Sequence, residues 1–178
     1  MLTERPRPSY VQMLLVTVLI IFIIAFAIIS MNTGDILWFW PVFDGKPQSI
    51  IVHCYGEDVH VETWNSAYEP LNLAVNQSLS GSKRWDPLSM SDQTYSDYQT
   101  GTTMVVVELT YDPPVRIHSS YKFFKNLDKV VIPLEGRHAS SNSVFGRLRG
   151  QMLAGSMHVK NTETIVTALE QQGLCRKP

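Results

Sequence analysis

The feature that most constrains this 178-residue chain is an uncharged stretch from Val11 to Met31. It reads VQMLLVTVLIIFIIAFAIISM, and only Gln12, Thr17 and Ser30 are polar. An α-helix rises 1.5 Å per residue, so a helix of this length spans roughly 31 Å, close to the thickness of the hydrocarbon core of a bilayer. In lipid every backbone amide must be paired internally, and a helix achieves this. The stretch therefore predicts one transmembrane helix over residues 11–31.

Basic residues on either side of this stretch predict its orientation. Arg5 and Arg7 precede it, whereas the 17 residues that follow contain one basic residue, Lys46. Short flanking segments rich in Lys and Arg stay in the cytoplasm. We therefore expect residues 1–10 to be a cytoplasmic lead and the C-terminal part of the chain to be extracytoplasmic, either periplasmic or extracellular.

A cleaved signal peptide is the alternative interpretation of the apolar stretch. The triplet Ala25-Phe26-Ala27 resembles the small-residue pattern of a cleavage site. However, Ile28 and Ile29 continue the apolar run beyond the triplet, and the apolar region of a signal peptide is usually about 7 to 15 residues long. We therefore expect a retained signal anchor that crosses the cell membrane once.

An aromatic segment follows the apolar stretch. It reads ILWFWPVF from Ile36 to Phe43, and amphipathic rings of this kind favour the headgroup layer of a membrane. Pro41 prevents a continuing helix, and Gly45-Lys46-Pro47 is typical of a linker. We interpret residues 32–48 as an interfacial aromatic segment and linker. The aromatic side chains form either an interfacial belt or a contact patch for another membrane subunit, made by Trp38, Phe39, Trp40 and Phe43.

The apolar stretch itself offers little for specific helix packing. Helices associate in lipid through small residues, and this stretch has only Ala25, Ala27 and Ser30. At 100° per residue these three do not share one face. The pattern favours a helix that serves as a tether, with specific contacts made by the aromatic segment and the outer domain.

Residues 49–178 are expected to form a single α+β domain. The whole chain is 44% hydrophobic and 17% charged, which favours a buried core over disorder. Alternating and helical apolar periods predict mostly antiparallel strands with two or three short helices. The expected elements are a hairpin within 49–64, a helix over 70–79, a short helix capped by Ser89 or Ser91, a three-strand meander over 102–111, 115–124 and 129–134, a strand over 152–159, and a last helix capped by Asn161.

Two cysteines, Cys54 and Cys175, limit the possible cofactors. The sequence has no Cys-x-x-Cys-His motif for covalent haem and no paired thiols for zinc or an iron–sulfur cluster. In an oxidising compartment the two cysteines can form one disulfide that closes a loop of about 120 residues. A free Cys54 buried beside Ile50 and Val52 is the other possibility.

Histidine positions raise a metal hypothesis. A two-residue turn at Gly56-Glu57 would place His53 and His60 opposite each other, near enough to share an ion, whereas a turn shifted by one residue would separate them. Spacing identifies no third ligand, and the 11–31 stretch has no histidine to bind a haem. We therefore expect structural histidines and no cofactor.

The loop from Glu135 to Ser143 combines a carboxylate, His138 and three serines, which are the residue types of an acid, a base and a nucleophile. However, the chain lacks the nucleophile-elbow, Walker and zinc-protease motifs, and loops of this composition are usually solvated connections. We therefore do not expect an enzyme. Arg147 and Arg149 suggest either a site for a carboxylate or lipid phosphate, or a solvated strand edge.

The formal charge of −1 provides no basic surface for nucleic acid. One span, an aromatic exit and a domain without catalytic motifs favour a non-catalytic accessory subunit of a larger membrane complex. Its partners would be the other subunits and the bilayer, and an energy-transducing complex, respiratory or photosynthetic, is the first candidate host. A free-standing anchored ligand-binding or sensor module is the main alternative, and an anchored enzyme is a third class.

Overall fold

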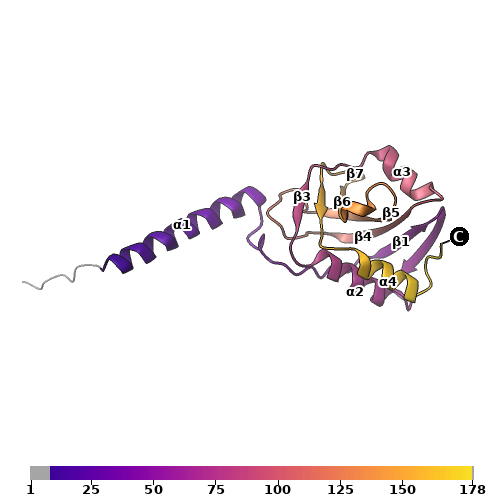
Figure 1. Ribbon diagram of the computed structural model, residues 1–178, viewed down its shortest axis with the longest axis horizontal. Helices are drawn as coiled ribbons and strands as arrows, with labels where there is room; N and C mark the ends of the chain where they lie inside the picture. Colours follow the sequence, from indigo (N-terminus) through magenta and orange to yellow (C-terminus); the bar gives the residue numbers. More distant parts are fainter. Residues whose placement is uncertain (1–8, 178) are drawn as a thin grey trace, which may run out of the picture.

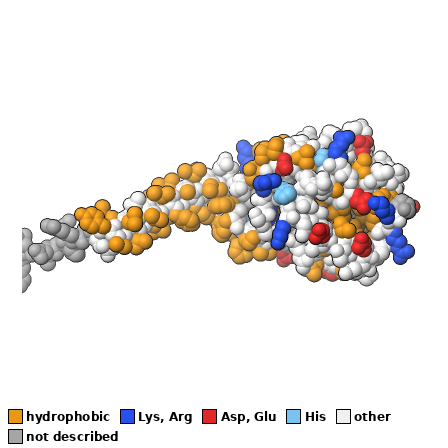
Figure 2. All heavy atoms as spheres, viewed as in Figure 1, with side chains coloured by type: hydrophobic (Ala, Val, Ile, Leu, Met, Phe, Trp, Pro, Cys, Tyr) orange, Lys and Arg blue, Asp and Glu red, His pale blue; other side chains and the backbone are white. Residues whose placement is uncertain are grey.

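A computed structural model describes residues 9–177, and Figure 1 shows a long helix that projects from an α+β domain. This helix, α1, covers Tyr10–Thr33 and is long and apolar enough to cross a membrane. Its side chains lie outside the domain core, and hydrophobic side chains cover its visible surface (Figure 2). Retained spans and N-terminal signal sequences share this length and composition. Arg5 and Arg7, on which the expected orientation depends, lie outside the described residues.

One antiparallel sheet forms the centre of the domain, in the order β2-β1-β4-β5-β6-β8-β3, with β7 paired to β6. The elements of the domain are β1 (Ser49–Cys54), β2 (Glu57–Glu62), α2 (Tyr68–Leu79), β3 (Arg84–Asp86), α3 (Asp92–Thr100), β4 (Val105–Val115), β5 (Leu127–Glu135), η1 (Ala139–Ser141), β6 (Ser143–Leu148), β7 (Gln151–Met152), β8 (Ser156–His158) and α4 (Glu163–Gln171). The expected α+β class with antiparallel strands is confirmed.

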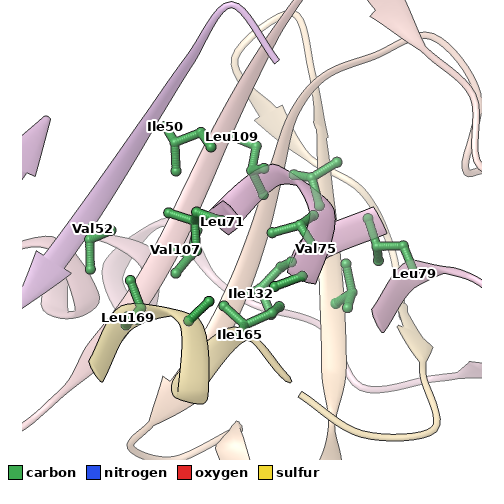
Figure 3. Close-up of a cluster of buried hydrophobic side chains, with 14 of the residues drawn as sticks. Ile50, Val52, Leu71, Val75, Leu79, Val107, Leu109, Ile132, Ile165 and Leu169 are labelled. Atoms are coloured by element: carbon green, nitrogen blue, oxygen red, sulfur yellow. The ribbon is translucent and has the colours of Figure 1, made fainter. Parts of the chain in front are cut away.

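Helices α2 and α4 pack side by side on one face of the sheet and enclose the main core (Figures 1 and 3). The helices contribute Leu71, Val75 and Ile165, all completely buried. Alternate residues of the central strands point toward them, as strand geometry requires. The strand residues labelled in this core are Ile50, Val52, Val107, Leu109 and Ile132.

Helix α3 covers part of the opposite face. Its Tyr95 and Tyr98 are buried against strand side chains. The Ser91 side chain accepts a hydrogen bond from the Thr94 backbone N–H at 3.1 Å, so the N-cap expected at Ser89 or Ser91 is at Ser91. The remaining buried members of this smaller cluster are Met90, Val106, Val131 and Phe145.

The predicted strand over residues 115–124 is wrong. Strand β4 continues to Val115 and pairs with β5, and residues 116–126 form a loop. Pro113 and Pro114 favour extended backbone but donate no hydrogen bond, so they shift the register after Thr110 instead of reversing the chain. The prediction rested on the alternation of Val115, Ile117, Tyr121 and Phe123, of which Phe123 is 41% exposed. Ile117 and Phe124 anchor the loop in the core.

Other boundaries also differ from the sequence prediction. Strands β3 and β6 were not predicted, and the expected strand over 152–159 is divided into β7 and β8. Gly155 separates these two strands with φ +81°, and a side chain there would collide with the Trp85 indole. Thr162, not Asn161, occupies the N-cap of α4. In α4, Ile165 and Leu169 are buried, whereas Val166 is 36% exposed.

Candidate functional site: the junction between helix and domain

Helix α1 ends in a tightly bonded turn. Gly34 adopts φ +62°, the left-handed conformation typical of a helix C-terminus, and donates its backbone N–H to the Ser30 carbonyl. The Asp35 N–H also reaches this carbonyl, at 3.2 Å. The Thr33 hydroxyl donates to the Ile29 carbonyl at 2.9 Å. The chain therefore leaves the helix in one defined direction.

A buried carboxylate then joins the helix end to the domain. Asp35 is 9% exposed, and its Oδ2 lies 2.8 Å from His118 Nδ1. Arg116 Nη1 lies 3.6 Å from Asp35 Oδ1 and donates to the Gly34 carbonyl at 2.7 Å. The Leu37 N–H donates to Asp35 Oδ1 at 2.9 Å. We call Asp35, Arg116 and His118 the Asp35 cluster, and it connects positions about 80 residues apart in sequence.

The domain side of the Asp35 cluster is firmly held. Arg116 and His118 flank Ile117, whose N–H donates to the Phe124 carbonyl at 3.0 Å. Ile117 and Phe124 are each 1% exposed, so both ends of this loop are fixed in the core. Sequence reasoning missed the cluster because it assigned residues 115–124 to a strand. The sequence did contain a signal, because Arg116 and His118 lie on either side of Ile117 and Asp35 follows the apolar stretch closely.

Aromatic side chains also connect the exit segment to α1. The Trp38 and Phe39 rings lie 6.4 Å and 6.0 Å from the Phe26 ring of α1 and 5.7 Å from each other. Phe26 precedes the helix end by about two turns, so the chain folds back along the helix. Aromatic pairs at these separations attract one another. Trp40 is 48% exposed, whereas Phe43 is 5% exposed and packs on Tyr111, which removes Phe43 from the expected contact patch.

The expected linker is not a free tether. Asn76 of α2 accepts from the Gly45 N–H at 3.1 Å and donates to the Gly45 carbonyl at 3.0 Å. The Tyr68 hydroxyl donates to the Pro47 carbonyl at 2.5 Å, and the Phe43 N–H donates to the Ser80 hydroxyl at 3.0 Å. Residues 34–48, which we call the exit segment, are therefore bonded to the domain over most of their length.

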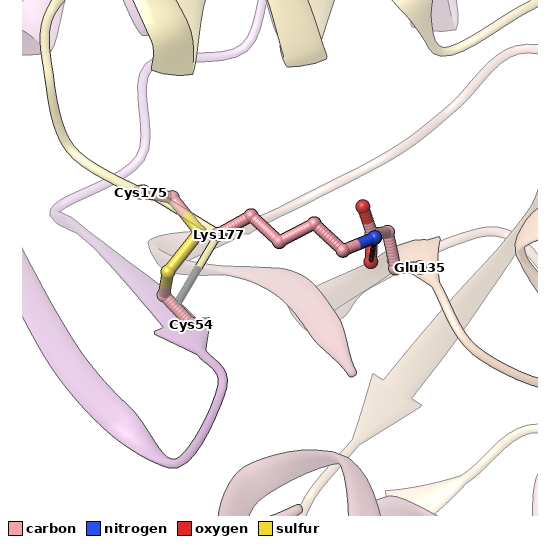
Figure 4. Close-up of a disulfide and its surroundings, with 4 residues drawn as sticks. All are labelled: Cys54, Glu135, Cys175 and Lys177. Carbon is pink, nitrogen blue, oxygen red and sulfur yellow. Dashed lines mark ion pairs between the residues drawn. A yellow bond between two sulfur atoms is a disulfide. The ribbon is translucent and has the colours of Figure 1, made fainter. Parts of the chain in front are cut away.

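A disulfide joins Cys54 at the end of β1 to Cys175 after α4, with their Cα atoms 5.7 Å apart (Figure 4). Lys177 beside it pairs with Glu135 across 3.7 Å. The bond lies near the C-terminus, at the end of the domain away from α1 (Figure 1). It therefore stabilises the domain but does not belong to the junction.

The histidines expected near one hairpin do not form a pair. The turn lies at Tyr55-Gly56, so His53 is opposite Asp58 and His60 is opposite Ile51. His53 is buried, and its Nδ1 lies 2.6 Å from Asp58 Oδ1. Within residues 9–177, three or more His, Cys, Asp or Glu side chains nowhere converge as a metal site would require.

The polar loop over residues 135–143 does not bring an acid, a base and a nucleophile together. His138 is buried with its ring 6.0 Å from Tyr98 and 5.2 Å from Phe145. Burial, followed by the Arg137 charge, lowers the pKa of His138. Glu135 faces Lys177 instead, and the Ser141 hydroxyl donates to the His138 carbonyl at 2.7 Å. The imidazole therefore has a packing role.

A buried carboxylate on β4 forms a second polar cluster beneath α3. Glu108 is 1% exposed and accepts hydrogen bonds from the Tyr95 hydroxyl and the Lys129 ammonium. The Arg147 guanidinium lies over the Tyr95 ring at 4.3 Å. Burial and the adjacent Glu108 raise the pKa of the Tyr95 phenol. Arg147 is therefore stacked on a side chain of the fold, and Arg149 is exposed in the turn between β6 and β7.

Comparison with family models, curated proteins and solved structures gave no match. We use the term junction for the Asp35 cluster, the aromatic contact with Phe26 and the exit segment that is hydrogen-bonded to α2. The junction joins three parts of the chain that are distant in sequence, and it is the candidate functional site.

Proposed function

We propose that this chain is a non-catalytic accessory subunit of a larger membrane complex, anchored by α1. The observation that carries the proposal is the Asp35 cluster, in which a buried carboxylate ties the end of the helix to the domain at 2.8 Å and 3.6 Å. The exit segment adds hydrogen bonds to α2 along the same connection. Together these contacts support a domain whose distance from the membrane and orientation relative to α1 are fixed.

A fixed orientation matters for a subunit and much less for a module that binds a diffusing ligand. A subunit must present the same surface to neighbours that are themselves fixed in the membrane, and a flexible tether would add an entropic cost to every contact. The aromatic residues at the junction would supply a contact surface beside the bilayer, in which Trp38 is partly buried. Its members are Trp38, Phe39 and Trp40, of which Phe39 and Trp40 are about half exposed.

The domain is proposed to be extracytoplasmic, and the host to be an energy-transducing complex of the respiratory or photosynthetic type. A disulfide between Cys54 and Cys175 supports an oxidising compartment, and Arg5 and Arg7 ahead of α1 support a cytoplasmic N-terminus.

Protease digestion tests the sidedness. Protease added to cells that have lost only their outer barrier should remove the domain and leave a fragment containing α1, because the domain would face the added enzyme. The control is the same digestion after the membrane has been opened with detergent. A domain that stays intact until detergent is added would place it in the cytoplasm.

Purification in mild detergent tests the subunit assignment. The native chain should migrate with other membrane proteins in fixed stoichiometry. Replacing Trp38 and Trp40 together by Ala should lower the recovered partner about tenfold, because buried Trp residues are frequent interface hot spots. Replacing Trp64, which is 84% exposed and far from the junction in sequence, is the matched control and should leave recovery unchanged.

A second variant tests whether α1 acts mainly as a tether. Residues 11–31 are exchanged for an unrelated apolar span of equal length that keeps Phe26, since this ring holds Trp38 and Phe39. Association should survive this exchange. Release of the partners by the exchange alone would place recognition on the helix surface, and a monodisperse native monomer would favour the free-standing ligand-binding module.

A further inference from the structure

Two cavities of different chemistry meet at the aromatic turn of the junction. The first, which we call the apolar notch, has a volume of about 460 Å³ and lies between α1 and the exit segment. The second, which we call the Lys83 pocket, has a volume of about 280 Å³ on the domain side. Trp38 and Phe39 line both of them. The two spaces therefore share one aromatic wall at the level where the helix meets the domain.

The apolar notch has no polar lining atoms, which suits a hydrocarbon chain. Ala25 is its one small residue and creates the depth between larger neighbours. In the bilayer this groove would face acyl chains directly, because no residue in the apolar window of α1 is buried by the domain. The side chains that line the notch are Phe22, Ala25, Phe26, Ile29, Trp38 and Phe39.

The Lys83 pocket supplies positive charge and hydroxyl groups. The Lys83 ammonium donates to the Pro41 carbonyl at 3.0 Å and to the Gly81 carbonyl at 3.3 Å, and among the described residues no carboxylate pairs with it. An ammonium has three donors, so one remains for an anion. Ser82 and Ser120 line the same space and are exposed. Partial burial lowers the pKa of Lys83, an effect that a bound anion would oppose.

We propose that the junction binds one anionic phospholipid, with an acyl chain in the apolar notch and the headgroup phosphate in the Lys83 pocket. The shared wall of Trp38 and Phe39 lies where the glycerol region of such a lipid would sit, at the interfacial level that aromatic residues prefer. A transmembrane helix of a partner is the other possible occupant of the notch. It is less suitable, because it is apolar along its length and would leave the Lys83 charge without a counterpart.

Basic side chains around the junction also favour a negative headgroup. Arg116 lies beside Asp35, and the Lys125 ammonium lies near Gly34. Together with Lys83 these basic residues outnumber the two carboxylates of the exit segment, Asp35 and Asp44. Each basic residue near a membrane surface adds to the attraction of anionic lipid. The ligand comes from the bilayer, and the site shares Trp38 and Phe39 with the contact surface proposed for partner subunits.

The test uses the full-length protein in mild detergent, titrated with palmitoyl-oleoyl phosphatidylglycerol or with phosphatidylcholine of the same chains, and native mass spectrometry counts the bound lipids. We expect one phosphatidylglycerol to be retained about tenfold more strongly than phosphatidylcholine, because both lipids offer the phosphate but the choline ammonium of phosphatidylcholine is repelled by the Lys83 ammonium. Glycerol 3-phosphate, which has the phosphate without the chains, should not compete. Equal retention of the two lipids, or competition by glycerol 3-phosphate, would overturn the proposal.

Matched variants separate the two halves of the site. Lys83→Gln should abolish the preference for phosphatidylglycerol and Lys83→Arg should restore it, whereas Lys177→Gln at the far end of the domain should change nothing. Ala25→Phe should fill the notch and reduce retention of both lipids about tenfold, the effect of losing most of one apolar contact surface. Ala27→Phe, on an exposed position outside the notch, should not. An equal effect of Ala25→Phe and Ala27→Phe would contradict the proposal even if the Lys83 variants failed to fold.

Discussion

Replacing Cys54 and Cys175 together by Ala is expected to lower the free energy of unfolding by about 4 kcal/mol. The bond joins residues 121 positions apart, so it removes much of the conformational freedom of the unfolded chain. It also ties β1, next to the central strand β4, to the tail after α4. Urea unfolding of the full-length protein in detergent, followed by circular dichroism, measures the difference.

Two controls isolate the covalent bond from its surroundings. The wild-type chain unfolded in the presence of reductant should match the double variant within about 1 kcal/mol, because both lack the bond and differ only in two sulfur atoms. Lys177→Gln removes the neighbouring exposed ion pair with Glu135 and should change stability by less than about 1 kcal/mol. A double variant as stable as the oxidised wild type would show that the bond does not constrain the domain.

Glu108→Ala is expected to cost about 3 kcal/mol, the second large effect. This carboxylate is 1% exposed and accepts from Tyr95 and Lys129, so truncation leaves the buried Tyr95 hydroxyl without its acceptor and opens a cavity under α3. Lys129→Met should also cost about 3 kcal/mol, because it leaves the buried Glu108 carboxylate without its cation. Unfolding in urea measures both variants.

Glu57→Ala is the matched control for Glu108→Ala, since Glu57 is exposed on the edge strand β2 and should change stability by no more than about 0.5 kcal/mol. Glu108→Gln should fall between the two, because an amide oxygen can still accept from Tyr95 while the charge opposite Lys129 is lost. If Glu108→Ala were as mild as Glu57→Ala, the buried network would contribute nothing to the fold.

The sequence predicted the parts of the fold that depend on local periodicity. The apolar run over residues 11–31 predicted α1 to within two residues at each end, since an uncharged stretch of this length has few other structures available. Helical spacing of Leu71, Val75 and Leu79 likewise indicated α2. These patterns are read from neighbours along the chain and need no knowledge of the tertiary structure.

The junction was not predictable in the same way. Asp35 meets Arg116 and His118 only because a proline-containing strand runs on to Val115 and delivers the following loop to the helix end. A loop whose apolar residues alternate has the same sequence period as a strand, so the period alone does not distinguish the two. Phe43 presents the converse case, because its place among exposed aromatic residues gave no indication that it packs into the core on Tyr111.

The turn of the first hairpin shows how sensitive a proposed site is to register. A one-residue difference in the position of the turn separates His53 from His60 and places Asp58 opposite His53. Tyr55 adopts φ +52° in this turn, a left-handed conformation that is uncommon for Tyr and that the sequence does not predict. Pairs of ligands inferred across a hairpin therefore depend on a detail that composition does not determine.

The proposed function requires that the junction hold α1 and the domain in one fixed arrangement. Measuring the distance between α1 and the domain tests this requirement most directly. Spin labels at Leu19→Cys on α1 and Gln171→Cys on α4, both exposed positions, report this distance by double electron–electron resonance in lipid nanodiscs. We predict a single narrow distance distribution for the otherwise native chain. Asp35→Asn, which removes the charge facing Arg116 and His118, should broaden it, whereas Asp44→Asn, at an exposed carboxylate of the same exit segment, should not. A broad distribution in the native chain that Asp35→Asn leaves unchanged would contradict the account, because the domain would then hang from a flexible tether.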